Sequence, residues 1–295
     1  MTAKHISSRG RQSNKGNSKK KPTPNQSTKS SKDKNFRIHP HKLKNYKIKP
    51  ASAKSKVDGS DEIRLNKYIS NSGICSRREA DKFIKSGSAT VNGKIITEMG
   101  YKVTINDEVR FDGALISPEA KRYVLLNKPK NYITTMDDER GRKTVMELVQ
   151  TASKERIYPV GRLDRGTTGL LLFTNDGEMA KKLTHPKYQV KKLYQVTLDK
   201  KLAMRDLQKI EANFELDGKM VFVDKISYIE NKPKYEIGIE IHSGRNRIVR
   251  RIFENFGYKV IKLDRVIFAG LNKKNLSRGV WRHLTQLEIN TLKML

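Results

Sequence analysis

Cysteine is almost absent from this sequence, since Cys75 is the only one in 295 residues. A single cysteine excludes an internal disulfide and a multi-cysteine zinc site, and it fits a reducing cytoplasm. Long apolar runs are missing too: no stretch approaches about 18 consecutive apolar residues, and the first residues lack the apolar core of a signal peptide. We therefore expect a cytoplasmic protein that does not cross a membrane.

Acidic residues are scarce, with 31 Asp and Glu against 62 Lys and Arg, for a formal net charge of +31. A positive charge of this size indicates a polyanionic partner, and nucleic acid is favoured over a membrane surface because no long apolar segment accompanies the charge. The alternative is a merely solvated surface, which rarely carries so large an excess.

The charge is unevenly distributed along the chain. Residues 1–57 hold 17 Lys and Arg and one acidic residue, and they are rich in Ser, Asn and Pro. Such a segment cannot bury enough apolar surface to fold, so we expect residues 1–61 to form a disordered basic tail. The tail would serve as an electrostatic anchor for RNA or simply as a solubilising extension. The rest of the chain has 45 basic and 30 acidic residues and is therefore basic in its own right.

Two short helices are predicted between residues 62 and 87. The first carries apolar residues at helical spacing from Leu65 and ends near Gly73. The second begins at a capping box formed by Ser76 and Glu79, and it ends at Gly87. Its predicted inner face consists of Ala80, Phe83 and Ile84.

A β-hairpin follows the helices. Asn92-Gly93 lies between β-branched residues, and both central positions of the corresponding turn favour positive φ. Apolar residues from Val103 through Ile105 and Val109 to Phe111 predict one more pair of short strands. We therefore expect a small domain at residues 62–113 and a linker at 114–121.

This small domain resembles the S4-like, or alpha-L, RNA-binding domain. The resemblance rests on Arg64-Leu65-Asn66-Lys67-Tyr68-Ile69, on Ser76-Arg77-Arg78-Glu79-Ala80 and on Val91-Asn92-Gly93-Lys94. It implies that the basic face of the second helix and the adjoining hairpin bind structured RNA. The candidate RNA-binding residues are Arg64, Lys67, Arg77, Arg78, Lys82 and Lys94. Such a cluster recognises phosphates and helix shape rather than base sequence.

Residues 122–295 are predicted to form a second domain of class α+β, with a mainly antiparallel mixed sheet and flanking helices. Its first strand runs from Tyr123 and ends at Lys128-Pro129. Further strands are predicted at 170–174, 193–198, 221–229, 234–242 and 259–268. Helices are predicted at 144–150, 176–184, 203–213, 245–256 and 285–294.

A single carboxylate, Asp164, lies between Arg162 and Arg165 in a glycine-rich loop that leads into an apolar strand. A carboxylate held at the entrance of a rigid strand suits nucleophilic or acid–base chemistry. From the residues alone, however, an Asp in such a loop is more often a turn residue than a catalyst.

The motif Gly161-Arg162-Leu163-Asp164, followed by Thr168-Gly169-Leu170, resembles the catalytic motif of the RsuA/RluB/RluE/RluF-type ribosomal RNA pseudouridine synthases. Lys192-Leu193-Tyr194 and Gly244-Arg245-Asn246-Arg247-Ile248-Val249-Arg250-Arg251 resemble two further motifs of that family. The resemblance implies a catalytic Asp164, a Tyr194 that stacks on the target base and an Arg250 that pairs with Asp164. Without it, Tyr194 would be read as a core tyrosine and the arginines as a solvated helix face.

The sequence departs from the family at Arg247-Ile248, where many relatives have His-Gln, so Arg247 remains an alternative partner for Asp164. Together with Arg247, the other candidate RNA-binding residues of this domain are Arg162, Arg165 and Arg245. Within the family the chain is most similar to the large-subunit, RluB-type members, on Glu139-Arg140-Gly141-Arg142-Lys143-Thr144-Val145 and His185-Pro186.

The resemblance implies isomerisation of uridine to pseudouridine in ribosomal RNA, most closely 23S RNA, by base flipping and Asp-dependent glycosidic cleavage and religation. We expect no cofactor, because no glycine-rich phosphate-binding motif follows a strand, and no metal, because the histidines lack ligands at a suitable spacing. The partner would be ribosomal RNA, free or within a pre-ribosomal subunit, and the protein would act as a monomer. Two alternatives remain: a 16S RNA synthase, and a non-catalytic RNA-binding factor for ribosome assembly.

Overall fold

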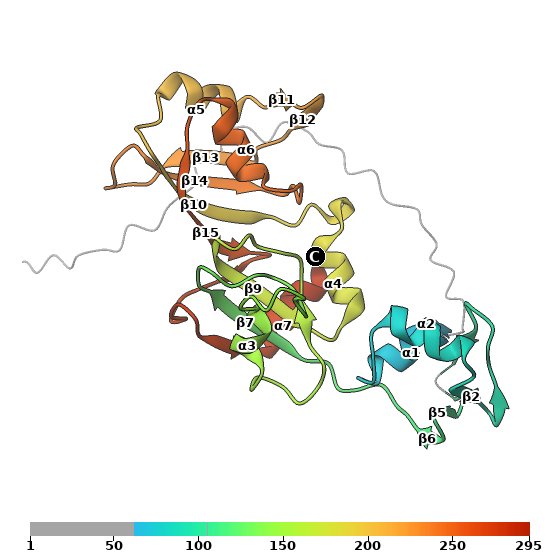
Figure 1. The fold of residues 1–295 in the computed structure, drawn as a ribbon. Coiled ribbons are helices and arrows are strands. Elements are labelled where there is room, and N and C mark those ends of the chain that lie inside the picture. Colours follow the sequence, from blue (N-terminus) through green and yellow to red (C-terminus); the bar gives the residue numbers. More distant parts are fainter. Residues whose placement is uncertain (1–61, 105) are drawn as a thin grey trace, which may run out of the picture. The chain divides into compact units, whose positions relative to one another are not determined.

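A computed structural model describes residues 62–104 and 106–295 of the chain. The predicted basic tail, residues 1–61, lies outside the described residues. The described residues form a small domain and a large domain (Figure 1).

The small domain combines two helices with short strands. The helices are α1 (Leu65–Asn71) and α2 (Arg77–Lys85). The strands are β1 (Ile63–Arg64), β2 (Ala89–Val91), β3 (Lys94–Ile95), β4 (Lys102–Val103), β5 (Val109–Phe111) and β6 (Ala114–Leu115). One sheet has the order β3-β2-β5-β6, and β1 pairs separately with β4.

Local sequence signals in this domain are confirmed. Ser76 accepts a hydrogen bond from the backbone N–H of Glu79, and the Glu79 carboxylate accepts one from the backbone N–H of Ser76. Asn92 and Gly93 have φ values of 50° and 80°, as the predicted hairpin turn requires. The apolar side chains of α1, α2 and the sheet form one core.

Three details of the small domain differ from the sequence-based predictions. Val103 lies on β4, which pairs with β1 instead of forming a hairpin with β5. The strand β6 lies within the segment that we assigned to the linker, and it pairs with β5. Phe83, predicted for the inner face of α2, is 40% exposed and packs edge-on against Phe111, with ring centroids 5.4 Å apart.

The large domain contains a long sheet with helices on both faces. Its longer strands are β7 (Tyr123–Lys128), β9 (Thr168–Thr174), β10 (Lys192–Leu198), β13 (Lys225–Tyr228), β14 (Glu236–Ile241) and β15 (Val260–Phe268). The short strands are β8 (Tyr158–Pro159), β11 (Phe214–Leu216), β12 (Lys219–Val221), β16 (Leu271–Asn272) and β17 (Trp281–His283). The helices are α3 (Val145–Val149), α4 (Gly177–Thr184), α5 (Met204–Glu211), α6 (Ile248–Asn255) and α7 (Gln286–Met294), with a 3₁₀ turn at Pro186–Tyr188.

The main sheet has the strand order β13-β14-β10-β15-β9-β7-β17. Its described pairings are antiparallel except for β9 with β15, which is parallel and joins only Thr168 to Asp264 and Gly169 to Arg265. We call this two-pair contact the seam. The two backbones approach so closely at the seam that a Cβ atom on Gly169 would lie 2.2 Å from the carbonyl oxygen of Arg265. The predicted α+β class and mainly antiparallel mixed sheet are confirmed.

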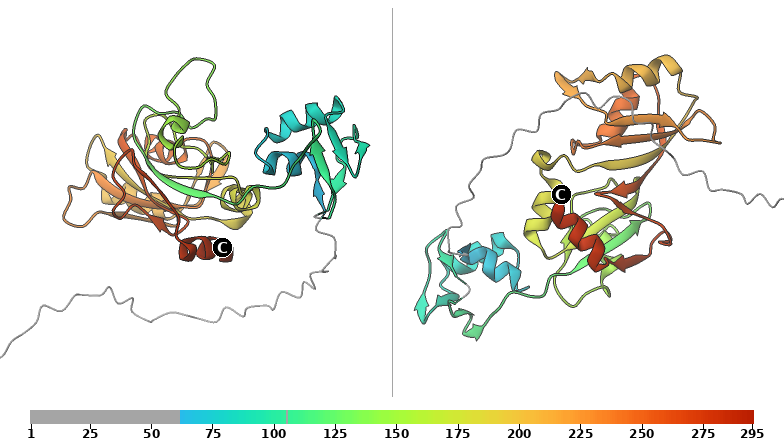
Figure 2. Two further views of the ribbon diagram at one scale, coloured as in Figure 1. Left: turned by 90° about the horizontal axis from the view of Figure 1, so that it is seen from below. Right: turned by 180° about the vertical axis from the view of Figure 1, so that it is seen from behind.

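The two faces of the sheet carry separate apolar cores, because successive residues of a strand point to opposite sides. Leu171 and Phe173 of β9 pack with α3, α5 and α6 on one face. Leu170 and Leu172 pack with α4 and α7 on the other face. Figure 2 (left) shows α3 and α7 on opposite sides of the sheet. The strands β7 and β9 are therefore buried on both faces, whereas β10 and β15 are fully buried on one face only.

Several boundaries in the large domain differ from prediction. The single strand expected at 221–229 is divided between β12 and β13, and the helix expected from residue 245 begins at Ile248. The short strands β8, β11, β16 and β17 were not predicted. Each of these strands is only two or three residues long, which is too short to show an alternating apolar pattern. They are defined by pairing with other strands, which the local sequence does not reveal.

Candidate active site

Asp164 lies in the loop that joins β8 to β9, immediately before the seam. The backbone N–H of Thr167 donates to the carbonyl oxygen of Asp164 at 3.0 Å, which closes a turn around the carboxylate. Gly161 adopts a φ of 75° in the same loop, a conformation that favours glycine. The loop thus presents one carboxylate from a tightly folded backbone.

Lys128 stabilises this loop through hydrogen bonds to its backbone. Its side chain is fully buried at the end of β7, and its Nζ donates to the carbonyl oxygens of Pro129, Asp164 and Thr167 at 3.1, 3.1 and 2.9 Å. Burial lowers the pKa of Lys128 to about 8, and the nearby Asp164 carboxylate opposes that shift. The ammonium group therefore holds both ends of the turn.

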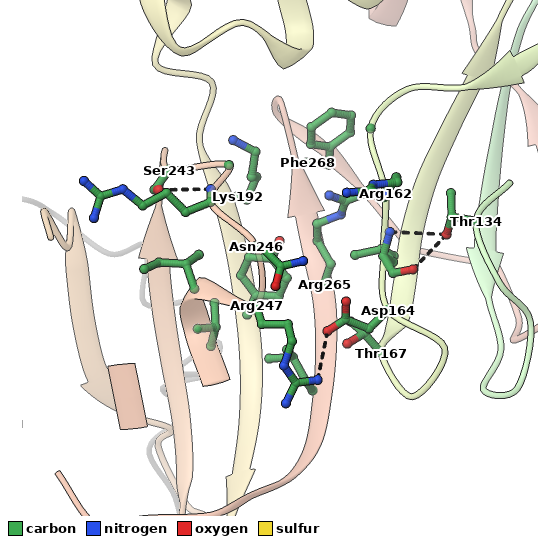
Figure 3. Close-up of a pocket in the computed structure, with 18 of the residues that line it drawn as sticks. Thr134, Arg162, Asp164, Thr167, Lys192, Ser243, Asn246, Arg247, Arg265 and Phe268 are labelled. Carbon is green, nitrogen blue, oxygen red and sulfur yellow. Dashed lines mark hydrogen bonds and ion pairs between the residues drawn. The ribbon is translucent and has the colours of Figure 1, made fainter. Parts of the chain in front are cut away.

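Thr134 holds the same loop from the side. Its Oγ1 donates to the carbonyl oxygen of Leu163 at 2.8 Å and accepts from the backbone N–H of Leu163 at 3.2 Å (Figure 3). Both contacts involve the residue directly before Asp164. Together with Lys128 they restrain the backbone on either side of the carboxylate, as a preorganised site requires.

Two arginines of the α6 region face the Asp164 carboxylate. Arg250 Nε and Arg247 Nη1 both lie 3.8 Å from Asp164 Oδ2. Arg250 is 13% exposed and donates to the carbonyl oxygen of Val260 at 2.9 Å, whereas Arg247 is 46% exposed. Burial and then repulsion from Arg247 lower the pKa of Arg250, yet a guanidinium stays charged in proteins. Arg247 has an unusual φ of 49°, which aims it at the carboxylate from the start of α6.

Asp164 opens onto a pocket of about 490 Å³ between the loop before β9, the strands β10 and β15, and the segment that leads into α6 (Figure 3). Tyr194 lines this pocket from β10 and is 8% exposed. Four of the predicted RNA-binding arginines also line it, and all four are exposed. They are Arg162, Arg165, Arg245 and Arg247. The pocket is thus deep and aromatic on one side and basic at its rim.

Two basic side chains of the pocket were not predicted as site residues. Lys192 donates to the carbonyl oxygens of Val190 and His242, and burial, followed by the nearby Arg265, lowers the pKa of Lys192 to about 8. Arg265 is 3% exposed and stands directly opposite Tyr194 across the β10–β15 pair. The sequence held one indication of this burial: Arg265 comes two residues after Leu263 in a predicted strand, so both side chains point to the same, buried face.

The predicted RNA-binding residues of the small domain lie on α1, α2 and the β2–β3 hairpin, with Arg64 at the start of α1. Arg64, Arg77, Arg78, Lys82 and Lys94 are exposed, and Lys67 is half-buried. Exposed cations on two capped helices and a hairpin can contact phosphates without desolvation of a deeply buried charge.

Two other kinds of feature, a metal site and a membrane-spanning helix, are absent from the described residues. No group of three His, Cys, Asp or Glu side chains in this part of the chain could hold a metal ion. None of the helices within residues 62–104 and 106–295 combines the length and apolar character needed to cross a bilayer. His242, isolated in the sequence, bonds through Nδ1 to the Asp224 carboxylate at 2.9 Å.

Comparison with known proteins matches two family models to the two domains. The S4 domain model matches residues 63–109, and the RNA pseudouridylate synthase model matches residues 122–255. A solved structure described as a crystal structure of pseudouridylate synthase has a TM-score of 0.55 and 30% identity, and the match covers 78% of this chain and 99% of that one. The chain belongs to the RNA pseudouridine synthases of the RsuA/RluB/RluF type and is therefore an isomerase.

Curated relatives cover nearly the whole large and small domains. Ribosomal large subunit pseudouridine synthase B of Bacillus subtilis (strain 168) is 42% identical over 240 residues, which are 79% of this chain and 96% of that protein. An uncharacterized RNA pseudouridine synthase of Aquifex aeolicus (strain VF5) is 38% identical, covering 78% and 94%. Dual-specificity RNA pseudouridine synthase RluF of Escherichia coli (strain K12) is 37% identical, covering 77% of each chain.

Proposed function

We propose that this chain converts a specific uridine of ribosomal RNA, in the 23S RNA of the large subunit, to pseudouridine. The observation that carries the proposal is the position of Asp164 beside Arg250 at the mouth of a pocket that Tyr194 lines. Similarity to a large-subunit synthase along 96% of that relative's length supports the choice of RNA. The protein would act in the cytoplasm as a monomer, on free RNA or on a pre-ribosomal subunit.

The reaction would begin with a flipped nucleotide, because the glycosidic bond of a stacked uridine is inaccessible. Tyr194 would stack on the everted base, and the exposed arginines at the pocket rim would hold the flanking phosphates. A neighbouring cation favours the ionised form of a carboxylate, so Arg250 would keep Asp164 charged and oriented.

Asp164 would then promote cleavage of the bond between ribose C1′ and uracil N1, by attack at the ribose or by removal of a ribose proton. The released uracil would rotate and rejoin the ribose through its C5 atom. Because the bond moves within a single nucleoside, the chemistry requires no cofactor. The exposed cations of the S4 domain would position structured RNA by phosphate contacts and helix shape.

The test is a pseudouridine map of ribosomal RNA from a deletion strain that carries variants of this gene. Asp164→Asn should abolish one or a few modifications in 23S RNA, because an amide can neither attack nor take a proton. Asp199→Asn is the matched control, since an amide oxygen still accepts the hydrogen bond from the backbone N–H of Lys259. Wild-type modification in the Asp164→Asn strain would contradict the proposal.

The same map decides between the two other candidate functions. A site lost from 16S RNA would identify a small-subunit enzyme. An unchanged map in the deletion strain itself would identify a non-catalytic binding protein.

A further inference from the structure

Arg265 is a buried cation in the wall of the catalytic pocket. It lies on β15 at the seam, it is 3% exposed, and it lines the pocket together with Asp164 and Tyr194. Figure 3 shows it on the same strand as Phe268, within the ring of residues around Asp164. It is thus far deeper than the exposed arginines of the rim.

The guanidinium of Arg265 is held rigidly. Its Nε donates to the carbonyl oxygen of Leu170 at 2.7 Å, and its Cζ lies 4.5 Å from the ring centroid of Phe268. Tyr194 is its neighbour directly across the β10–β15 strand pair. One donor atom is left over, because Nη2 is buried and has no hydrogen-bond partner among the residues that the structure describes.

The charge of Arg265 is not balanced within the described residues. Carboxylates of the described residues form ion pairs with other arginines, such as Arg250, Arg247 and Arg278, but none forms an ion pair with Arg265. A buried charge without a counter-charge is costly, and a buried donor without an acceptor adds to that cost. Burial lowers the pKa of Arg265, but the guanidinium stays protonated, so the positive charge persists in the pocket.

Building on the proposed function, we infer that Arg265 stabilises the uracil ring as an anion while the ring is detached from the ribose, by donating from Nη2 to one of the two uracil carbonyl oxygens. A fixed donor aimed at the place where charge develops acts most strongly in a water-poor pocket. Tyr194, which lies opposite Arg265 on β10 and lines the same pocket, would stack on the same ring. The buried cation and the aromatic ring would therefore hold the uracil together.

The electron balance of the reaction creates the anion that this cation needs. When the C1′–N1 bond breaks, its electron pair leaves with uracil and is shared among N1 and the carbonyl oxygens. When C5 attacks C1′, an electron pair of the uracil anion forms the new C5–C1′ bond. In the nucleophilic route the bond between C1′ and Asp164 breaks and its pair returns to the carboxylate; in the other route the proton that Asp164 removed returns to the ribose carbon. C5 then loses a proton through water and N1 gains one, so no net proton is consumed. Arg265 would stabilise the detached, negatively charged uracil more than the neutral uridine. An interaction that strengthens as this charge develops raises the rate of bond cleavage.

A phosphate of the RNA is a less suitable occupant for this donor. Phosphodiesters run along the outside of the everted nucleotide, where Arg162, Arg165 and Arg245 are exposed. Arg265 is 3% exposed and lines the pocket, so a group must enter the pocket to approach its guanidinium, and the base would be that group. A phosphate contact would appear in the experiment below as lost affinity without a lost rate.

The test uses the full chain and the RNA stem-loop that the pseudouridine map identifies, under single-turnover conditions with saturating enzyme. Arg265→Met should lower the rate constant about 10²–10³-fold, as loss of a preorganised donor does. The dissociation constant for the RNA should change less than about threefold, because the rim contacts remain. Lys262→Met, an exposed side chain on the same strand, is the control.

Substrates with 2-thiouridine or 4-thiouridine at the target position identify the carbonyl, because sulfur accepts hydrogen bonds poorly. For one of them, the ratio of the uridine rate to the thiouridine rate should be about tenfold or more larger in the wild type than in Arg265→Met, the range expected for a charge-assisted hydrogen bond. Thermal unfolding checks that the variant is folded; if it is not, the comparison is made with Arg265→Lys, which keeps the buried positive charge but has no atom in place of the Nη2 donor.

Equal ratios in the wild type and the folded variant, for both thio-substrates, would overturn the inference. So would weakened RNA binding with an unchanged rate constant, which would identify a phosphate contact. If the wild-type chain does not modify the RNA at all, the proposed substrate fails instead. The two failures are therefore distinguishable.

Discussion

At the scale of single residues, the Asp164 carboxylate has two cationic neighbours that differ in burial. Arg250 is 13% exposed and fixed to the carbonyl oxygen of Val260, whereas Arg247 is 46% exposed, although each lies 3.8 Å from Asp164. Interactions between exposed charges are screened by water and salt, and buried ones much less so. Arg250 is therefore the better candidate to orient Asp164.

We predict that Arg250→Met lowers the single-turnover rate at saturating RNA by about 100-fold or more, since small misplacements of a catalytic group have effects of this size. Arg247→Met should lower that rate less than about tenfold and should mainly weaken RNA binding, more so at low salt. Rate constants and dissociation constants at two salt concentrations provide the measurement. A larger rate loss in Arg247→Met would reverse the assignment.

The candidate site could be predicted from the sequence only as far as its motifs extend. Asp164, Tyr194, Arg247 and Arg250 belong to recognisable motifs, and the pocket brings Asp164, Tyr194 and Arg247 together, with Arg250 next to Asp164. Arg265 belongs to none of these motifs, and its burial depends on the pairing of two strands that are distant in the sequence.

At the scale of secondary-structure elements, the seam between β9 and β15 depends on one glycine. Gly169 has a φ of 106°, and a Cβ atom there would meet backbone atoms of Arg265 at 2.2 and 2.5 Å. Backbone atoms of two paired strands cannot move aside as a flexible side chain can. The sequence showed a glycine at this position, but not which strand it approaches.

Gly169→Ala should therefore destabilise the protein by about 3 kcal/mol, the upper range for an added atom without space. Gly238→Ala on β14 is the control, because its Cβ would meet nothing closer than Ser227 at 3.8 Å. Urea unfolding of both variants provides the measurement. Similar stabilities would mean that the strands separate at little cost.

The helix α7 begins with an ion-paired capping box. Glu288 accepts from both terminal nitrogens of Arg282, at 2.8 and 2.7 Å, and from the backbone N–H of Thr285 at 2.9 Å. Mainly because of the Arg282 hydrogen bonds, the pKa of Glu288 falls to about 2 from its ordinary value of 4.5. A carboxyl group with a lowered folded-state pKa stabilises the fold above its unfolded pKa and loses that effect as the pH falls towards the folded value.

We expect Glu288→Gln to lower the free energy of unfolding by about 1 kcal/mol at neutral pH, the usual cost of a lost helix cap. The difference from wild type should narrow as the pH falls from 4.5 towards 2. Unfolding curves across that range measure it, with the exposed Glu211→Gln on α5 as the control. A difference that is constant with pH would exclude the ion pair as its source.

Elements with local signals were predictable and those with distant partners were not. The Ser76 capping box and the Asn92-Gly93 turn depend on a few adjacent residues, and both are present as predicted. The pairing of β4 with β1 joins residues about 40 positions apart, and nothing in the local pattern of Val103 favours it over the nearer β5. Local chemistry selects a turn or cap, whereas strand partners depend on the whole fold.

At the scale of the whole molecule, positive charge is concentrated in the first 57 residues, which hold 17 Lys and Arg and one acidic residue. Phosphate neutralisation releases counterions, so each contact adds to the salt dependence of RNA binding. The predicted anchoring role of this segment can therefore be measured without knowledge of its conformation.

Removal of residues 1–57 should weaken RNA binding and reduce the slope of log Kd against log salt concentration by several units, at roughly 0.7 to 0.9 per lost phosphate contact. The single-turnover rate at saturating RNA should stay within about twofold, because every pocket residue lies beyond residue 130. A full-length chain with the 17 basic residues changed to Gln controls for length. An unchanged slope would favour a solubilising extension.

The seam joins the two parts of the sheet that carry the pocket residues, and it is only two residue pairs long. Asp164 precedes β9 on one side of that two-pair junction, while Tyr194, Arg250 and Arg265 belong to the other side. The groups that we propose to act on the uridine therefore lie on the two sides of a strand contact that is only two residue pairs long. We therefore expect a small twist of the sheet at the seam to change the distance between Asp164 and Tyr194 before it disturbs the longer strand pairs, so that activity is lost before the fold is.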